Sequence, residues 1–236
     1  MVKHLFFGLI MCIATMSQAQ NVQLHYDFLK DARDTKASGR GYLTSTIEMF
    51  HPDKSGSTFF FTDMDYNGDK GSVSLAYMEI TRDQKICKKL PLLAHFEYNG
   101  GLITEKNNFG LSFDNAFLLG FSYPFKIGDA SFSVYGAYKG IRNTTEGPDF
   151  QLTGTWFATL AKGKITLSGF IDIWSQDKFG ATGRDGKHIV LFTEPQIWYN
   201  FTKNFSAGSE IEISNNFVTK SEKLEIFPTA ALKYTF

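Results

Sequence analysis

The pattern that decides the fold lies in the last residues of the chain, Glu225-Ile226-Phe227-Pro228-Thr229-Ala230-Ala231-Leu232-Lys233-Tyr234-Thr235-Phe236. Apolar and polar side chains alternate there, and a period of two indicates a strand with one apolar face. Tyr234 and Phe236 end the chain, although a terminus usually frays into water. A transmembrane β-barrel needs its last strand to pair with its first, because an open edge in hydrocarbon leaves backbone groups unpaired. The alternative at this point is the last strand of a soluble sandwich.

The composition is typical of one large β-domain. The chain has 236 residues with 24 basic and 24 acidic side chains, so no net charge attracts a nucleic acid polymer. The mean hydropathy is slightly negative. That value argues against a helical membrane protein but not against a barrel, whose lumen face is polar. We therefore expect outer-membrane lipid as one partner and no nucleic acid.

The first residues read as a signal peptide, residues 1–19. Lys3 provides a charged start, an apolar stretch follows over 5–14, and Ser17-Gln18-Ala19 fits a cleavage site. Residues 20–236 would then form one barrel in the outer membrane of a Gram-negative bacterium. Cys87 is the cysteine left after cleavage, which predicts no intrachain disulfide.

The pattern predicts an all-β fold, an antiparallel transmembrane β-barrel of about twelve strands of the length that crosses a bilayer. The expected strands are 22–29, 42–50, 57–66, 72–82, 91–99, 110–123, 129–141, 150–160, 164–174, 188–200, 205–216 and 225–236. The even-numbered connections include very short turns such as 161–163, whereas most of the odd-numbered ones are longer and richer in Gly, Asn, Asp and Thr. Short periplasmic turns and longer external loops are typical of bacterial outer-membrane barrels.

Alternation within the strands predicts the lipid and lumen faces. In 164–174, Ile171 and Ile173 face one way, and Asp172 faces the other. The charged side must be the lumen, because a charge at bilayer depth costs several kcal/mol. The ambiguous strand 110–123 carries Phe117 and Phe121 in one phase, which suggests a bulge or a belt of lipid-facing rings.

The expected lumen joins aromatic rings to acids, a surface on which a flat, hydrogen-bonding solute can stack. The candidate solute-binding residues are Phe59, Phe61, Asp63, Asp65, Tyr77, Glu79, Phe170, Asp172, Trp174, Phe192 and Glu194. An equally weighted alternative is that these rings merely fill a small barrel and that the acids pair with Lys or Arg.

Three early segments resemble the Tsx-like nucleoside-specific outer-membrane channels, including their short, uncharacterised branch. The similar segments are Gly41-Tyr42-Leu43-Thr44-Ser45-Thr46-Ile47-Glu48-Met49-Phe50, Phe59-Phe60-Phe61-Thr62-Asp63-Met64-Asp65 and Ala76-Tyr77-Met78-Glu79-Ile80. With the aromatic C-terminus, the resemblance covers residues 40–82 and the last strand. It implies a narrow twelve-stranded barrel that passes nucleosides, with Phe59, Phe61, Asp63, Tyr77 and Glu79 at matching positions.

Catalytic and metal sites find little support in the sequence. The histidines His25, His51, His95 and His188 are scattered, and no pattern places one beside a serine as a lipid-modifying barrel enzyme would need. Asp63 and Asp65 alone imply no third metal ligand. We therefore expect a channel for small solutes, most favourably nucleosides, without enzymatic activity, metal or cofactor. The alternatives are a structural, adhesive or lipid-modifying barrel without a solute pore, and a soluble secreted β-protein.

Overall fold

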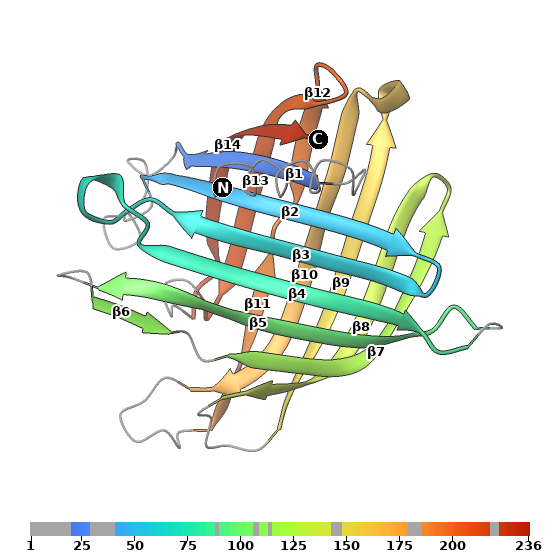
Figure 1. Ribbon diagram of the computed structural model, residues 1–236. Coiled ribbons are helices and arrows are strands. Elements are labelled where there is room, and N and C mark those ends of the chain that lie inside the picture. The colour runs from blue at the N-terminus through green and yellow to red at the C-terminus, as the bar shows by residue number, and fades with distance from the viewer. Residues whose placement is uncertain are drawn as a thin grey trace, which may run out of the picture.

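The computed structural model describes residues 20–28, 41–87, 90–105, 109–112, 115–142, 148–178, 186–217 and 222–236. The expected signal peptide, residues 1–19, lies outside these ranges. Long tilted strands wrap around a central axis, and β14, the last strand, lies beside β1, the first (Figure 1).

Nearly all of the described chain is in strands. The strands are β1 (Gln20–Asp27), β2 (Leu43–Asp53), β3 (Gly56–Asp65), β4 (Leu75–Lys85), β5 (Leu93–Glu105), β6 (Phe109–Ser112), β7 (Ala116–Ile127), β8 (Ala130–Ile141), β9 (Asp149–Leu160), β10 (Ile165–Asp177), β11 (Lys187–Thr193), β12 (Gln196–Asn200), β13 (Phe205–Asn215) and β14 (Glu225–Thr235). Two short 3-10 turns, η3 (Asp69–Gly71) and η5 (Ala161–Gly163), lie in connections.

These strands close into an antiparallel barrel with twelve strand positions. The fourteen strands fill twelve positions because β6 pairs with β5 outside the ring and β11 and β12 together occupy one position. The ring closes where β1 pairs with β14, from Asn21 opposite Thr235 to Asp27 opposite Thr229. The expected fold class is thus confirmed, and so is the closing role of the last strand.

The two ends of the barrel differ in their connections. Gln20 and Phe236 meet at one end, where the Phe236 amide donates to the Gln20 carbonyl at 3.0 Å. The β2–β3, β7–β8 and β9–β10 connections at this end have only two to four residues between the strands. The β4–β5 connection at this end is longer, with seven residues, and the other long connections leave the opposite end. This alternation is the one expected from the sequence.

Two strands differ from the expectation in their extent. β5 continues to Glu105 and forms a hairpin with β6, so the predicted loop over 100–109 is largely strand, and the predicted strand 110–123 is two separate strands. β5 continues through Gly100 and Gly101, although glycines favour turns, because both pair with β4, at Met78 and Tyr77.

The predicted strand 188–200 is broken at Glu194-Pro195, between β11 and β12. A proline has no amide hydrogen to donate to the ladder, which explains the interruption. The chain comes so close to β10 there that a Cβ on Gly169 (φ +152°) would lie 2.6 Å from the Glu194 carbonyl oxygen. Only glycine accepts that backbone angle and that contact.

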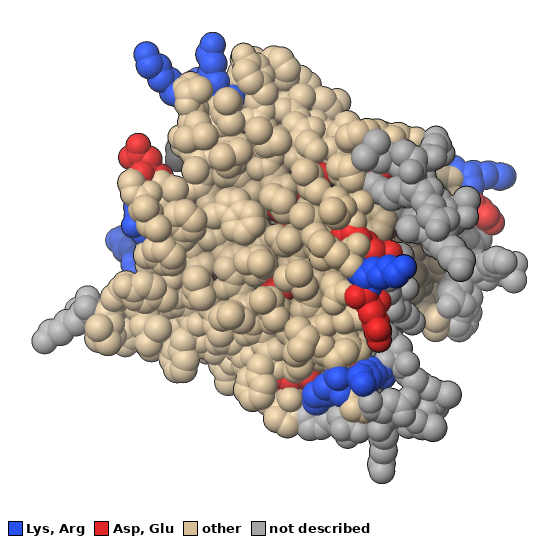
Figure 2. Space-filling view, turned by 180° about the vertical axis from the view of Figure 1, so that it is seen from behind, with Lys and Arg blue, Asp and Glu red and all other residues tan. Residues whose placement is uncertain are grey.

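The outer wall is apolar over the strands (Figure 2), with Lys, Arg, Asp and Glu gathered mainly toward the edges of this face. Phe117, Leu119 and Phe121 are each more than half exposed, which agrees with the expected belt of lipid-facing rings. Aromatic pairs near the terminal end, such as Tyr234 and Phe236 at 5.2 Å between centroids, form a further belt. No helix among the described residues is long and apolar enough to cross a membrane.

Candidate functional site

The inner wall on β2–β5 carries aromatic and acidic side chains in register. Glu48 of β2 lies opposite Phe61 of β3, Phe61 opposite Glu79 of β4, and Glu79 opposite Asn99 of β5. Residues opposite each other share a sheet face, so this row runs across four adjacent strands. The next row toward the long-loop end joins Thr46, Asp63, Tyr77 and Gly101. The sequence-predicted residues of β3 and β4 therefore lie on one wall.

The aromatic rings of this wall form a continuous group. The Phe61 centroid lies 5.9 Å from that of Phe59 and 6.0 Å from that of Tyr77. All three side chains are half-buried, so part of each ring remains accessible. On the facing side of the ring of strands, Phe170 of β10 and Phe192 of β11 are 5.2 Å apart and also half-buried. The fold thus brings five of the predicted aromatic residues to two walls of one interior.

The acids of the interior receive hydrogen bonds from neutral donors. Asp63 accepts from the Thr46 hydroxyl at 2.5 Å, Glu79 from the Tyr77 hydroxyl at 2.5 Å, and Asp172 from the Thr153 hydroxyl at 2.5 Å. A fourth acid, Glu48, accepts from the Asn21 amide at 3.1 Å. Within the described ranges none of these four acids has a Lys or Arg within salt-bridge distance. Lys233 acts on Glu48, and Lys139 acts on Glu79 and Asp172, from beyond that distance, so neutral donors rather than ion pairs hold these acids.

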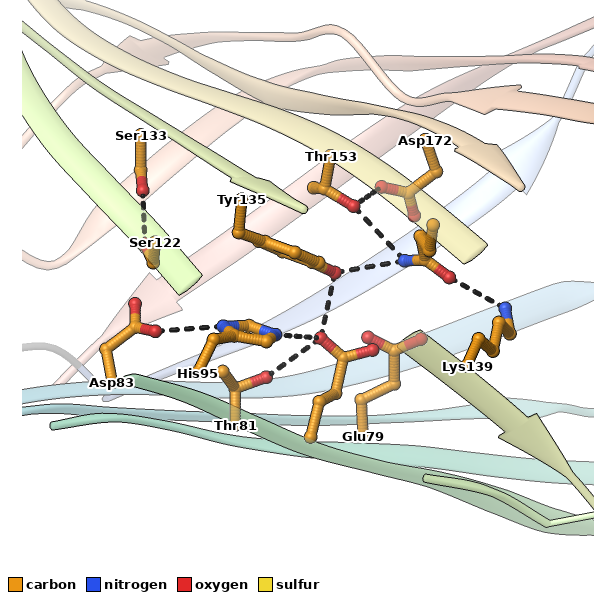
Figure 3. A network of polar contacts seen from close by, with 12 residues as sticks. Glu79, Thr81, Asp83, His95, Ser122, Ser133, Tyr135, Lys139, Thr153 and Asp172 are labelled. Atoms are coloured by element: carbon orange, nitrogen blue, oxygen red, sulfur yellow. Dashed lines mark hydrogen bonds and ion pairs between the residues drawn. The ribbon is translucent and has the colours of Figure 1, made fainter. Parts of the chain in front are cut away.

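A buried network joins β4 and β5 to β8 and β9 (Figure 3). His95 lies between Asp83, at 2.8 Å from Nδ1, and Glu97, at 3.2 Å from Nε2. Tyr135 stacks on the His95 ring at 3.8 Å and donates its hydroxyl to Glu97 Oε2 at 2.8 Å. Because both imidazole nitrogens face carboxylate oxygens, the geometry fits the doubly protonated ring.

The two lysines of the interior turn toward aromatic rings. Lys139 donates to Gln151 at 2.7 Å, and its Nζ lies 4.3 Å from the Trp174 ring centroid. Lys233 Nζ lies 3.9 Å from the centroid of Trp198. Such cation–π contacts stabilise a lysine away from water. They leave the half-buried acids without a basic partner.

Part of the interior is filled by side chains, as the packing alternative expected. Val190 on β11, Trp198 on β12 and Phe227 on β14 are completely or almost completely buried, and Leu118 on β7 is 3% exposed. The half-buried aromatic residues of the predicted site lie on β3, β4, β10 and β11. The barrel therefore combines packed interior positions with two walls of partly accessible rings.

Three predicted site residues do not join the half-buried ring groups of these walls. Asp65 accepts from Tyr42 and Thr44 near the long-loop end. Trp174 is 6% exposed and packs edge-on against Phe217. Glu194 lies at the break between β11 and β12.

The network around His95 was missed by the sequence reasoning. His95, Glu97 and Asn99 alternate along one strand, which was the available signal. Its partners Tyr135 and Gln151 are distant in sequence, so only the fold brings them together.

An antiparallel barrel with an apolar outer wall, aromatic belts and a polar interior defines the class of outer-membrane β-barrels. The chain belongs to the family described as "Domain of unknown function (DUF5020)", whose model matches residues 19–236. No curated protein matches it.

Solved outer-membrane proteins are distantly similar. In-vitro folded OmpT, an outer membrane protein of Vibrio cholerae, has 12% identity and a TM-score of 0.38, with 91% of this chain and 75% of that one covered. Outer-membrane expressed OmpT of Vibrio cholerae has 10% identity and a TM-score of 0.37, with 93% of this chain and 78% of that one covered. A bacterial polysaccharide outer membrane secretin has 8% identity and a TM-score of 0.35, with 94% and 99% covered.

The expectation that the chain has no enzymatic activity is corrected. Enzymatic activity is not excluded, because the reason for excluding it fails: the histidines are not all isolated. The fold holds His95 between two carboxylates, with Tyr135 stacked on its ring.

The class of outer-membrane β-barrels predicts where the protein resides. Because its outer wall is apolar, we expect it to fractionate with the outer membrane and to require detergent for extraction. A folded barrel should also migrate differently on a gel before and after boiling. Recovery in the soluble periplasmic fraction would contradict this expectation.

Proposed function

We propose that this protein is an outer-membrane channel through which small solutes diffuse passively, with nucleosides as the favoured class. One observation carries the proposal: half-buried aromatic rings alternate with acids that have only neutral hydrogen-bond donors, inside a closed barrel. Phe61 with Glu79 on one wall and Phe170 with Asp172 on the other are the clearest examples. Rings give a stacking surface, and unneutralised carboxylates give hydrogen-bond acceptors.

The chemistry of a nucleoside matches this surface. Its flat base can stack on Phe59, Phe61 and Tyr77, and base–aromatic stacking contributes about 1–3 kcal/mol per base. Its ribose hydroxyls can donate to Asp63 and Glu79. A simple sugar offers only the hydroxyls, and a nucleoside monophosphate is repelled by the acids. The resemblance of residues 40–82 to Tsx-like channels supports the same solute class.

The test is solute entry into liposomes that contain the purified protein. We expect nucleosides to enter faster than sugars of similar size and faster than nucleoside monophosphates. Phe61→Ala should remove much of the preference for nucleosides over sugars and leave nonspecific leakage intact. Phe60→Ala is the matched control, because Phe60 precedes Phe61 on β3 and is directly opposite Ile80, which is exposed on the outer side of the sheet.

The outcomes separate the candidate functions. Equal entry of all three solutes would make the protein a general pore, and no entry would make it a barrel without a solute path. Equal effects of Phe61→Ala and Phe60→Ala would show that the inner ring has no special role. Each of these results contradicts the nucleoside proposal.

A further inference from the structure

The wall around Glu79 holds buried acceptors that lack a donor. Its hydroxyl donors are already used: the Tyr77 hydroxyl goes to Glu79, and the hydroxyls of Thr81 and Tyr135 go to Glu97 Oε2. The amide nitrogen of Gln151 is likewise used, by the Tyr135 hydroxyl at 3.0 Å and by Thr153 Oγ1 at 3.1 Å. Acceptor atoms are left over on this wall.

Two of the leftover acceptors are buried. Glu97 Oε1 and Asn99 Oδ1 have no hydrogen-bond partner among the described residues, and their side chains belong to residues only 6% and 7% exposed. Burying a polar atom without a partner costs about 1–3 kcal/mol, so such atoms indicate a missing donor. Asn99 is directly opposite Glu79 in the β4–β5 ladder, and Glu97 is opposite Thr81, the next inward residue of β4.

Glu97 and Glu79 are diagonal neighbours on the inner face of the β4–β5 ladder. The hydrogen bonds of Glu97 all involve Oε2, which leaves Oε1 without a donor. Glu79 is half-buried, so its carboxylate lies between the buried acceptors and the accessible interior. Asp172 and Lys139 both act on Glu79 electrostatically, with opposite signs.

His95 contacts Glu97 on Oε2, and no cation among the described residues contacts Glu79. Lys139 acts on both acids only from a distance, because its Nζ donates to Gln151 and lies over the Trp174 ring. A donor supplied by the solute would therefore complete the hydrogen bonding of this wall. Phe61 and Tyr77, 6.0 Å apart, flank Glu79 and provide flat surfaces for a ring that carries such a donor.

We infer that Glu79, with Glu97 and Asn99 behind it, forms a subsite for an amino group or protonated amine carried on a flat ring. This inference rests on the proposed channel function and names the preferred subclass of solute. Among nucleosides, those with an exocyclic amino group should be favoured over analogues that carry a carbonyl oxygen at the same place. Adenosine and inosine form a matched pair, because the purine amino group of one is a carbonyl in the other.

The test is block of the ion current through the protein in a planar bilayer by added nucleoside. We expect adenosine to reach half-block at a concentration about tenfold lower than inosine, which corresponds to about 1.4 kcal/mol. Cytidine should likewise reach half-block at a lower concentration than uridine. In Glu79→Gln the adenosine–inosine difference should disappear, because the introduced amide can itself donate to Glu97.

Glu210→Gln is the matched control. Glu210 is an acid on the inner face of β13 whose carboxylate already accepts from Gln196 at 2.6 Å. Its substitution should therefore leave unchanged the ratio of the half-block concentrations of adenosine and inosine. The adenosine–inosine comparison needs no variant, so it decides the inference even if Glu79→Gln does not fold.

The results distinguish the inference from the function on which it rests. Equal half-block by adenosine and inosine, with both nucleosides still entering liposomes, would overturn the amino subsite and keep the nucleoside channel. Loss of the ratio in Glu210→Gln as well as in Glu79→Gln would also overturn it, because the effect would then be general charge. If neither nucleoside blocks the current and neither enters liposomes, both the amino subsite and the nucleoside channel are overturned.

Discussion

Ile171→Arg should destabilise the barrel by roughly 2–4 kcal/mol if the residue lies near the bilayer midplane, because lipid cannot solvate its guanidinium group. Ile171 lies on the outer side of β10, is 40% exposed, and pairs with Gly154 of β9 and Thr193 of β11. The measurement is urea unfolding of the barrel in lipid vesicles, with intrinsic tryptophan fluorescence as the signal. This variant tests the assignment of the two faces most directly.

Thr155→Arg is the control for this substitution. Thr155 lies on the inner side of β9, half-buried and directly opposite Phe170. An arginine there can reach the acids of the interior, so its cost should be much smaller. Thr166 is a less suitable inner position, because it is only 7% exposed and accepts from Asn200 at 2.9 Å. Equal destabilisation by Ile171→Arg and Thr155→Arg would mean that the inner and outer faces are assigned wrongly.

Deletion of Phe236 should reduce the amount of folded barrel in the outer membrane far more than it disturbs barrels that do assemble. Phe236 is 64% exposed, packs edge-on against Tyr234, and donates its amide to Gln20 at the seam between the first and last strands. Its loss removes a ring from the interfacial belt and a hydrogen bond from the closing pair. The measurement is the heat-modifiable fraction in isolated outer membranes.

Phe236→Tyr is the control for the deletion, because it keeps the ring and the backbone amide. We expect it to assemble like the unaltered chain. A deletion variant that accumulates to the normal level in folded form would show that the terminal residue is dispensable for closure.

The sequence alone determined the class of fold and the faces of the strands. The alternation Ile171, Asp172, Ile173 follows from the strand period of two, and a charge cannot face lipid, so periodicity and charge were sufficient. The same reasoning placed Phe59, Phe61 and Asp63 on one inner wall, because they lie two residues apart along one strand.

The tertiary structure alone decided which inner residues meet and which of them stay accessible. Trp174 has the same alternation as Asp172, yet it is packed against Phe217 from the connection that follows β13. His95 looked isolated in the sequence, but it is stacked on Tyr135 from β8, forty residues later. Strand periodicity assigns a side chain to a face, whereas its neighbours across the interior depend on barrel closure and strand register, which no local pattern contains.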